Sequence, residues 1–396
     1  MDKVIYFYYN MSIINQGRIL LMRFIAILLA SIGVTAHADT FMYRYPLNLT
    51  IKNNAVIEKK ADVISCGLAH CYALVSGEIW SIGGNDFGQL GVPDNAQSAK
   101  TWLNTHVKAS AIAAGANFGL AISNGRVLAV GDNSSAQLGL GDKANRYIWT
   151  DTGLNAKKIT ANYSNGYAIN SDQKVYSSGS NSHGQRALGN FDDTALSWAD
   201  TGLMATEIAA GGLHCYAIRI DGIVQAVGWG SSGQLGIGNT EDRSSWASTG
   251  LSATKIASGL KSGYVISNDL LYVTGSNTVG QLGTGDLQDK MSWFNSGVSA
   301  TNVFSAFSHA YAIVNGNVYA TGENDQGQLG LANRNNETSW RFTGISAKIV
   351  FPGAKNGYAM NNDGLYATGS IGDYVSYDTS WRIQSNQFTD IIDVNK

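Results

Sequence analysis

Three features of this chain have residue types and spacing that could carry out chemistry, and the first is a glycine-rich stretch. It reads GENDQGQLGLANRNNETSW from Gly322. A phosphate-binding P-loop needs Gly-Lys-Ser/Thr at the start of a helix, but apolar residues or glycine follow GQLG here. A calcium loop needs carboxylates at alternate positions and a later glutamate, but the acids of this stretch do not recur in its copies. The stretch is therefore interpreted as scaffold.

Histidines are the second feature. Three of them, His70, His214 and His309, fall at one position of an internal repeat, where other copies have Phe118, Asn165, Ser262 or Asn356. A metal site needs histidines that converge, whereas these three belong to separate copies. They are interpreted as turn residues bonded to the backbone. Neither a metal nor another cofactor is expected.

The cysteines suggest a different chemistry. Cys66 and Cys71 lie five residues apart in SCGLAHCY, and Cys215 stands alone. The sequence has no Cys-x-x-Cys motif of the kind that binds metal. Opposite positions of a hairpin lie about 5 Å apart, within the range of a disulfide. We therefore predict a Cys66–Cys71 disulfide with Cys215 free, and three buried thiols are the alternative.

The N-terminal region reads as a targeting signal. From Met22 the sequence MRFIAILLASIGVTAHADT has a charged residue, an apolar run and Ala-His-Ala in the order of a secretory signal peptide. We expect translation to start at Met22, residues 1–38 to be the signal-peptide region, and the mature chain, 39–396, to be periplasmic or extracellular. The apolar run is too short to span a membrane. A buried segment of the fold is the alternative.

The charge balance limits the partners. Charged residues make up 14% of the chain and the net charge is −2, with the basic residues scattered. Nucleic acids and anionic membranes are attracted by a basic field. No nucleic-acid partner is therefore expected.

The glycine-rich stretch recurs along the chain. Its glutamine falls at Gln89, Gln137, Gln185, Gln234, Gln281 and Gln328, and the tryptophan that closes it at Trp102, Trp149, Trp198, Trp246, Trp293, Trp340 and Trp381. Repeats of about 48 residues therefore fill the mature chain as a single domain. The predicted units are 61–107, 108–155, 156–204, 205–252, 253–299, 300–346 and 347–396.

Each unit has short apolar runs separated by Gly, Asn and Asp, a pattern that predicts four strands. Sheets repeated in this way hide their edges when they are arranged radially, so we predict an all-β, seven-bladed β-propeller. An open solenoid would need distinctive capping repeats. The segments 43–51 and 389–394 each look like a spare strand, and one of them is expected to close the ring.

The repeated G-x-N-x-x-G-Q-L-G followed by tryptophan, with H-x-Y-A-I, resembles the regulator of chromosome condensation repeat family over about residues 61–381. The resemblance implies a seven-bladed β-propeller. The seventh unit departs from the pattern, with GSIGDYVSYDTSW in place of the GQLG loop. Nuclear members of the family act as guanine nucleotide exchange factors for a small GTPase. Secreted bacterial propellers similar to this one include an inhibitor of β-lactamases that binds a protein through one face.

The motifs G-x-S-x-G and H-E-x-x-H do not occur. In an antiparallel blade the strand 1–2 turn and the strand 3–4 loop emerge on one face, and these segments differ between units. We therefore predict a non-enzymatic, exported module that binds a protein, or alternatively a glycan, through this face. A second hypothesis is an exchange factor for a small GTPase, disfavoured because no unit has a long insertion. The third is an enzyme with a site in the central channel.

Large residues that are specific to single units on this face are the predicted partner-binding residues: Trp229, Phe118, Phe87, Tyr163, His183, Tyr147 and Phe307. Aromatic residues on loops either pack locally or anchor a partner. Trp229 and Phe118 are expected to be the main anchors, because other units have small or polar residues there. The opposite face, with Asp172, Asp221 and Asp269, is the alternative.

Overall fold

The structure, a computed structural model, describes residues 5–15, 18–28, 54–59, 61–92, 97–371, 375–376, 379–384 and 388–393. The chain divides into two units, Met1–Asn53 and Asn54–Lys396. In the first, β1 (Ile5–Asn15) pairs with β2 (Arg18–Leu28) as an antiparallel hairpin. The expected cleavage site after Ala38 and the expected strand over 43–51 lie outside the described residues. Within the described ranges, no helix is long and apolar enough to cross a membrane.

The second unit is a succession of antiparallel sheets, and within each sheet of the ring most strands pair with their neighbours in the chain. In order they are β4 (Ala61–Cys66), β5 (His70–Val75), β6 (Glu78–Gly84), β7 (Ser98–Lys108); β8 (Ala111–Ala114), β9 (Phe118–Ser123), β10 (Arg126–Gly131), β11 (Arg146–Asn155); β12 (Lys158–Asn162), β13 (Asn165–Ile169), β14 (Lys174–Gly179), β15 (Ala199–Ala210); β16 (His214–Arg219), β17 (Ile223–Gly228), β18 (Arg243–Ser252); β19 (Lys255–Ser258), β20 (Ser262–Ser267), β21 (Leu270–Gly275), β22 (Lys290–Ser299); β23 (Asn302–Ala306), β24 (His309–Val314), β25 (Asn317–Gly322), β26 (Glu337–Ser346); and β27 (Ile349–Pro352), β28 (Asn356–Met360), β29 (Leu365–Ile371), β30 (Val375–Ser376), β31 (Arg382–Gln384).

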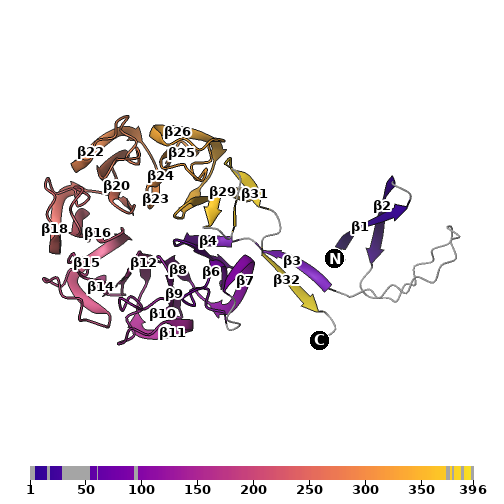
Figure 1. Cartoon of the computed structure of the whole chain (residues 1–396), viewed down its shortest axis with the longest axis horizontal. Coiled ribbons are helices and arrows are strands. Elements are labelled where there is room, and N and C mark those ends of the chain that lie inside the picture. The colour runs from indigo at the N-terminus through magenta and orange to yellow at the C-terminus, as the bar shows by residue number, and fades with distance from the viewer. Residues whose placement is uncertain are drawn as a thin grey trace. The chain divides into compact units, whose positions relative to one another are not determined.

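These strands form blades around a central axis (Figure 1). The long strand β15 serves two of them, because Met204 pairs with β14 while Ala205 pairs with β16. The other pairings give four-stranded sheets, β4–β7, β8–β11, β19–β22 and β23–β26, and a five-stranded sheet, β27–β31. The first strands β4, β8, β12 and β23 lie near the centre of the ring in Figure 1. The predicted all-β propeller architecture is confirmed.

The burial of the strands follows from their place in a blade. The second strands, such as β5 and β20, are buried along their whole length, because other blades or strands cover both of their faces. Along the fourth strand β18, residues alternate between half-buried and exposed at its end, as expected at the rim. The period-two pattern of the sequence therefore survives mainly on the outermost strands.

The repeated loop is held by its own side chains, as the scaffold interpretation requires. In the stretch that begins at Gly322, Leu329 N donates to Asn324 Oδ1 at 2.9 Å, and Gln326 N donates to Gln328 Oε1 at 2.9 Å. The glycines let the next blade approach. Gly283 has φ +67°, and Trp340 Nε1 lies 2.4 Å from where a Cβ would stand, so only glycine fits.

The ring closes differently from our expectation. The segment predicted as a spare strand forms most of β32 (Phe388–Asp393), which pairs with β3 (Asn54–Lys59) and not with a blade. The prediction that this terminal strand closes the ring is wrong, because the first and last blades take all their strands from their own units. The two blades meet instead through side chains, with Cys66 and Trp102 in one core cluster with Tyr358.

Candidate binding surface

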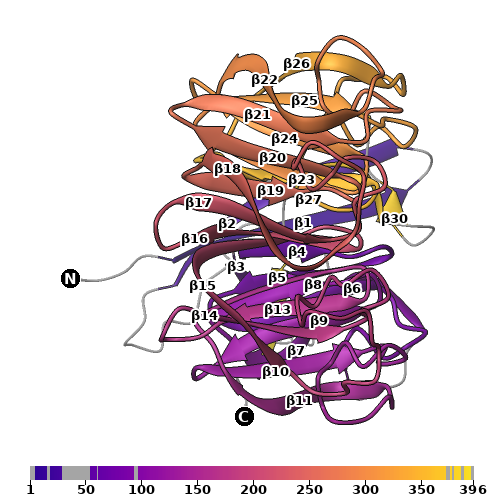
Figure 2. The same ribbon diagram turned by 90° about the vertical axis from the view of Figure 1, so that its left-hand side faces the viewer.

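The two faces of the ring differ in the connections they carry. The turns between first and second strands and the loops between third and fourth strands emerge together, and we call this side the loop face. The turns between second and third strands emerge on the opposite hairpin face. In Figure 2 the strands run across the view between these two faces.

Phe118 is not on the surface. It begins β9, has an exposed fraction of 0% and belongs to a core cluster with Leu120 and Leu138. Its ring fills the space beside Gly115, whose Cβ, if present, would lie 1.9 Å from a ring carbon. The prediction that Phe118 anchors a partner is wrong, because the first residue of each second strand points between blades and not into solvent.

The histidines at the position equivalent to Phe118 also lie between blades. His70, His214 and His309 are each fully buried. Burial lowers the pKa of His70 to about 4, partly opposed by a backbone hydrogen bond at Phe118, and burial lowers the pKa values of His214 and His309 to about 3. His214 Nε2 lies 3.0 Å from Ser258 Oγ in the next blade. These histidines are neutral packing groups between blades.

Tyr163 and Phe307 lie in the turns before second strands, where both adopt a left-handed backbone with φ 38° and 49°. The Tyr163 side chain is 44% exposed, and Phe307 is half-buried. Their carbonyls accept hydrogen bonds from neighbouring blades, Tyr163 O from Ala116 N at 2.9 Å and Phe307 O from Leu260 N at 2.7 Å. The turns are therefore locked by the backbone while Tyr163 presents its ring to solvent.

Phe87 and Tyr147 lie farther out. Phe87 is half-buried in the first 3–4 loop, where its N donates to Gln89 Oε1 at 2.9 Å. Tyr147, on β11, is 50% exposed and covers Gly88 of the preceding blade, whose Cβ would meet the ring at 2.5 Å. Tyr147 therefore both packs across a blade boundary and exposes half of its surface.

Trp229 and His183 come together, although they belong to different blades. Their ring centroids are 5.4 Å apart, and both side chains are half-buried. Asp242 holds the histidine through Oδ2, 2.7 Å from Nδ1. Lys261, from the following blade, places Nζ 4.4 Å from the centroid of the Trp229 ring. Three blades thus build one cluster on the loop face.

Lys261 and Asp242 were missed by the sequence reasoning, which searched for large residues that vary between units. The signal for Lys261 is a comparison of the turn positions themselves, GLKSGY against GAKNGY, which both carry lysine. Asp242 occupies a loop position that is polar in other units, such as Asn145 and Asp289, so it does not stand out.

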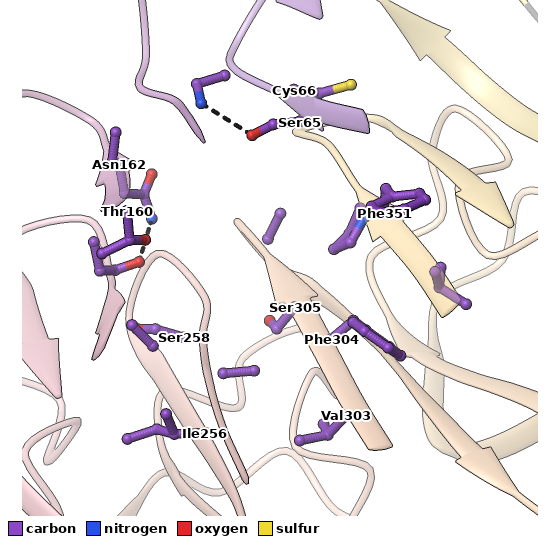
Figure 3. Close-up of a pocket in the computed structure, with 18 of the residues that line it drawn as sticks. Ser65, Cys66, Thr160, Asn162, Ile256, Ser258, Val303, Phe304, Ser305 and Phe351 are labelled. Atoms are coloured by element: carbon purple, nitrogen blue, oxygen red, sulfur yellow. Dashed lines mark hydrogen bonds between the residues drawn. The ribbon is translucent and has the colours of Figure 1, made fainter. Parts of the chain in front are cut away.

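The central channel is a cavity of about 400 Å³ lined by the first strands of the blades (Figure 3). Polar groups reach it, such as Ser65, Asn162 and Ser305, but hydrogen bonds within and between blades use them: Ser305 Oγ donates to His309 O of its own blade at 3.0 Å. Ser65 Oγ accepts from Ala114 N at 2.9 Å, and Asn162 Nδ2 donates to Ala210 O at 3.1 Å. Lys255 is the one charged residue in this lining. The polar groups of this lining therefore hydrogen-bond to backbone atoms of the blades.

The cysteines are placed by the first blade. Cys66 and Cys71 are directly opposite in the β4–β5 hairpin and are joined by a disulfide. Cys215 is free and fully buried, and burial raises the pKa of its thiol. Within the described residues, no cluster of three or more histidine, cysteine, aspartate or glutamate side chains is arranged to hold a metal ion.

Comparison with solved structures identifies the fold. Yeast RCC1 (Prp20) bound to Kap60 superposes with a TM-score of 0.67 at 18% identity, covering 76% of this chain and 80% of that one. A second structure of Prp20p, from Saccharomyces cerevisiae, has a TM-score of 0.66 at 20% identity over 76% and 83% of the chains. Human WBSCR16 matches with 0.59 at 22% identity over 64% and 72%.

The chain therefore has the β-propeller fold of the regulator of chromosome condensation proteins, as its repeats suggested. These identities establish the fold alone. No protein-family model and no curated protein matches the sequence.

Proposed function

We propose that this chain is an exported, non-enzymatic binding module whose loop face binds a protein. The observation that carries the proposal is a difference between repeated and unit-specific residues. The repeated residues hold the loops and blades together, whereas the unit-specific Tyr163, Tyr147 and Trp229 present aromatic surface on the loop face. Aromatic residues on a rigid frame are the usual anchors of protein interfaces.

Rigidity favours binding. The turns that carry Tyr163 and Phe307 are fixed by hydrogen bonds between blades, and the 3–4 loops are fixed by their asparagine and glutamine side chains. Little conformational entropy would be lost when a partner docks, so more of the contact energy would appear as affinity. Protein binding is also what similar propellers do, since Prp20 is described bound to Kap60 and as binding Gsp1p and histones. The partner need not be of the same kind.

The test uses the mature domain as bait, with proteins of the periplasm and of the culture medium offered separately. A loop-face variant, Tyr163→Ala with Trp229→Ala, is expected to lose at least tenfold in affinity for the captured protein. The control is Ile220→Ala, an equally apolar and 56% exposed residue on the hairpin face. If the control loses affinity and the loop-face variant keeps it, both being folded, the partner binds the hairpin face and the proposal fails.

A further inference from the structure

Two lysines occupy the same position in turns before second strands, and they have different surroundings. Lys355, between β27 and β28, places Nζ 2.8 Å from Glu323 Oε1 and 3.0 Å from Asp325 Oδ1 of the preceding blade. Lys261, between β19 and β20, places Nζ over the Trp229 ring. The chain thus contains its own example of what a lysine in this turn binds, namely carboxylates.

The fourth unit has replaced both carboxylates. Trp229 follows Gly228 where Glu323 follows Gly322, and Ser231 stands where the sixth unit has Asp325. Among the described residues, no carboxylate forms an ion pair with Lys261. The nearby Asp242 is already engaged, since Oδ2 contacts His183 Nδ1 and Oδ1 accepts from Gly230 N at 2.9 Å. The result is a half-buried lysine beside an aromatic ring, with no ion-pair partner in the part of the chain that the structure describes.

We propose that Lys261 and Trp229 form a binding site for a carboxylate, supplied by an acidic side chain of the protein partner. This inference rests on the proposed function and specifies the partner's chemistry. An ammonium group over a ring retains N–H donors that point away from it. The carboxylate would take the place that Asp325 and Glu323 take beside Lys355, while the aromatic face of Trp229 would pack on the methylene groups of a glutamate.

The neighbours of the site suit this role. His183 covers one part of the Trp229 ring and is itself held by Asp242, so the ring is supported before a partner arrives. Lys261 is partly shielded from water, which strengthens its attraction for a carboxylate relative to a fully exposed lysine. Salt should weaken the interaction, because part of the site faces solvent.

The site can be tested without the partner. The probe is N-acetyl-glutamate, with N-acetyl-glutamine as its neutral control, titrated into the mature chain labelled with 15N at the tryptophan indoles. The Trp229 signal is assigned by its loss in Trp229→Phe. We expect a saturable shift of this signal with the acid in the millimolar range and no shift with the amide.

Three variants sharpen the result. Lys261→Met should abolish the shift, and Ser231→Asp should reduce it at least fivefold, because it restores an internal carboxylate as in the sixth unit. Lys355→Met is the matched control and should respond like the wild type. Unchanged signals of the other tryptophans show that each variant is folded.

The outcomes separate the two proposals. Equal responses to acid and amide, no response to either, or a response that survives Lys261→Met would overturn the carboxylate site. If the loop-face variants still lose the captured partner in that case, the proposed function stands and only the carboxylate assignment fails. Conversely, the wild-type chain could respond to the acidic probe while the loop-face variant still binds the captured protein. That result would support the carboxylate site and overturn the proposed function.

Discussion

Arg186 offers a sharp test of how this fold tolerates a change in loop length. It occupies the position that is leucine in the other complete loops, Leu138 and Leu282 among them, and like them it is 0% exposed. A buried guanidinium is costly unless it is fully hydrogen-bonded. Burial lowers its pKa, but arginine stays charged because its ordinary value is so high.

The cause is an extra residue in the third loop. Four residues separate Asp193 from Trp198, whereas three separate Asn145 from Trp149. As a result β15 begins only after its tryptophan, while β11 begins before its own. The extra residue leaves backbone carbonyls outside the strand ladder. Arg186 bonds them, with Nη1 2.5 Å from Ala195 O and Nη2 2.7 Å from Ser197 O.

We therefore expect Arg186→Leu to destabilise the protein, although it restores the common residue. Two hydrogen bonds to a charged group are worth about 3–6 kcal/mol. Burying a leucine side chain returns about 1.5–3 kcal/mol. The central values of these two ranges predict a loss of about 2 kcal/mol in the free energy of unfolding, measured by urea denaturation.

Deletion of Ala195 supplies the matched control. The deletion restores the three-residue spacing, so Arg186→Leu combined with it should be close to wild type, and the two changes should couple by more than about 1 kcal/mol in a double-mutant cycle. Additive effects, or an Arg186→Leu protein as stable as wild type, would refute the idea that the arginine compensates for the extra residue.

Three further predictions rest on the described contacts, and a fourth rests on the sequence of the N-terminal region. Burial lowers the pKa values of His70, His214 and His309 from the ordinary 6.5 to about 4, 3 and 3. The histidines therefore contribute no pH dependence above about pH 6.5, and the free energy of unfolding should fall below that pH, by about 2 kcal/mol per histidine at pH 5. Replacing one histidine by asparagine, which other units have at this position, should flatten the pH dependence of the melting temperature. Trp340→Ala should cost about 2–3 kcal/mol by denaturant titration, at the low end for tryptophan because the ring is half-buried. Alkylation without reduction should label Cys215 alone after unfolding, with Cys66 and Cys71 protected. N-terminal sequencing of the native protein should begin at Asp39.

The frame was predictable from the sequence because its contacts are local and repeated. The Asn324 side chain accepts a hydrogen bond from Leu329 N, and the Gln328 side chain accepts one from Gln326 N. Both contacts span five residues or fewer, so the same residue types recur wherever the loop recurs. The closing of the ring was not predictable in the same way. It depends on side-chain packing between the first and last blades, where Cys66 and Trp102 share a core cluster with Tyr358, and no repeated pattern marks a contact between residues so far apart in the chain.

Phe118 shows where reasoning from unit-specific residues fails. A large aromatic in place of polar residues suggests an exposed anchor, but the position faces the neighbouring blade, where a phenylalanine fills the same space as His70 or His214. The sequence alone does not tell which side of a turn residue faces solvent. Tyr163, in the corresponding turn of the next unit, is 44% exposed, whereas Phe307 has the same left-handed backbone and is half-buried.

The fourth unit combines two departures from the repeat, and together they bear on function. Gly230 replaces the asparagine that elsewhere accepts a bond from the loop backbone, so this loop lacks the bond that Asn324 Oδ1 accepts from Leu329 N. It keeps only the bond from Gly230 N to Asp242 Oδ1, which matches that from Asn324 N to Asn336 Oδ1. Trp229, immediately before it, replaces a residue that is small or polar in other units. The fourth unit therefore lacks a stabilising contact of the repeat next to the position where it has an aromatic residue. Departures from the stabilising pattern of a fold are expected at binding surfaces.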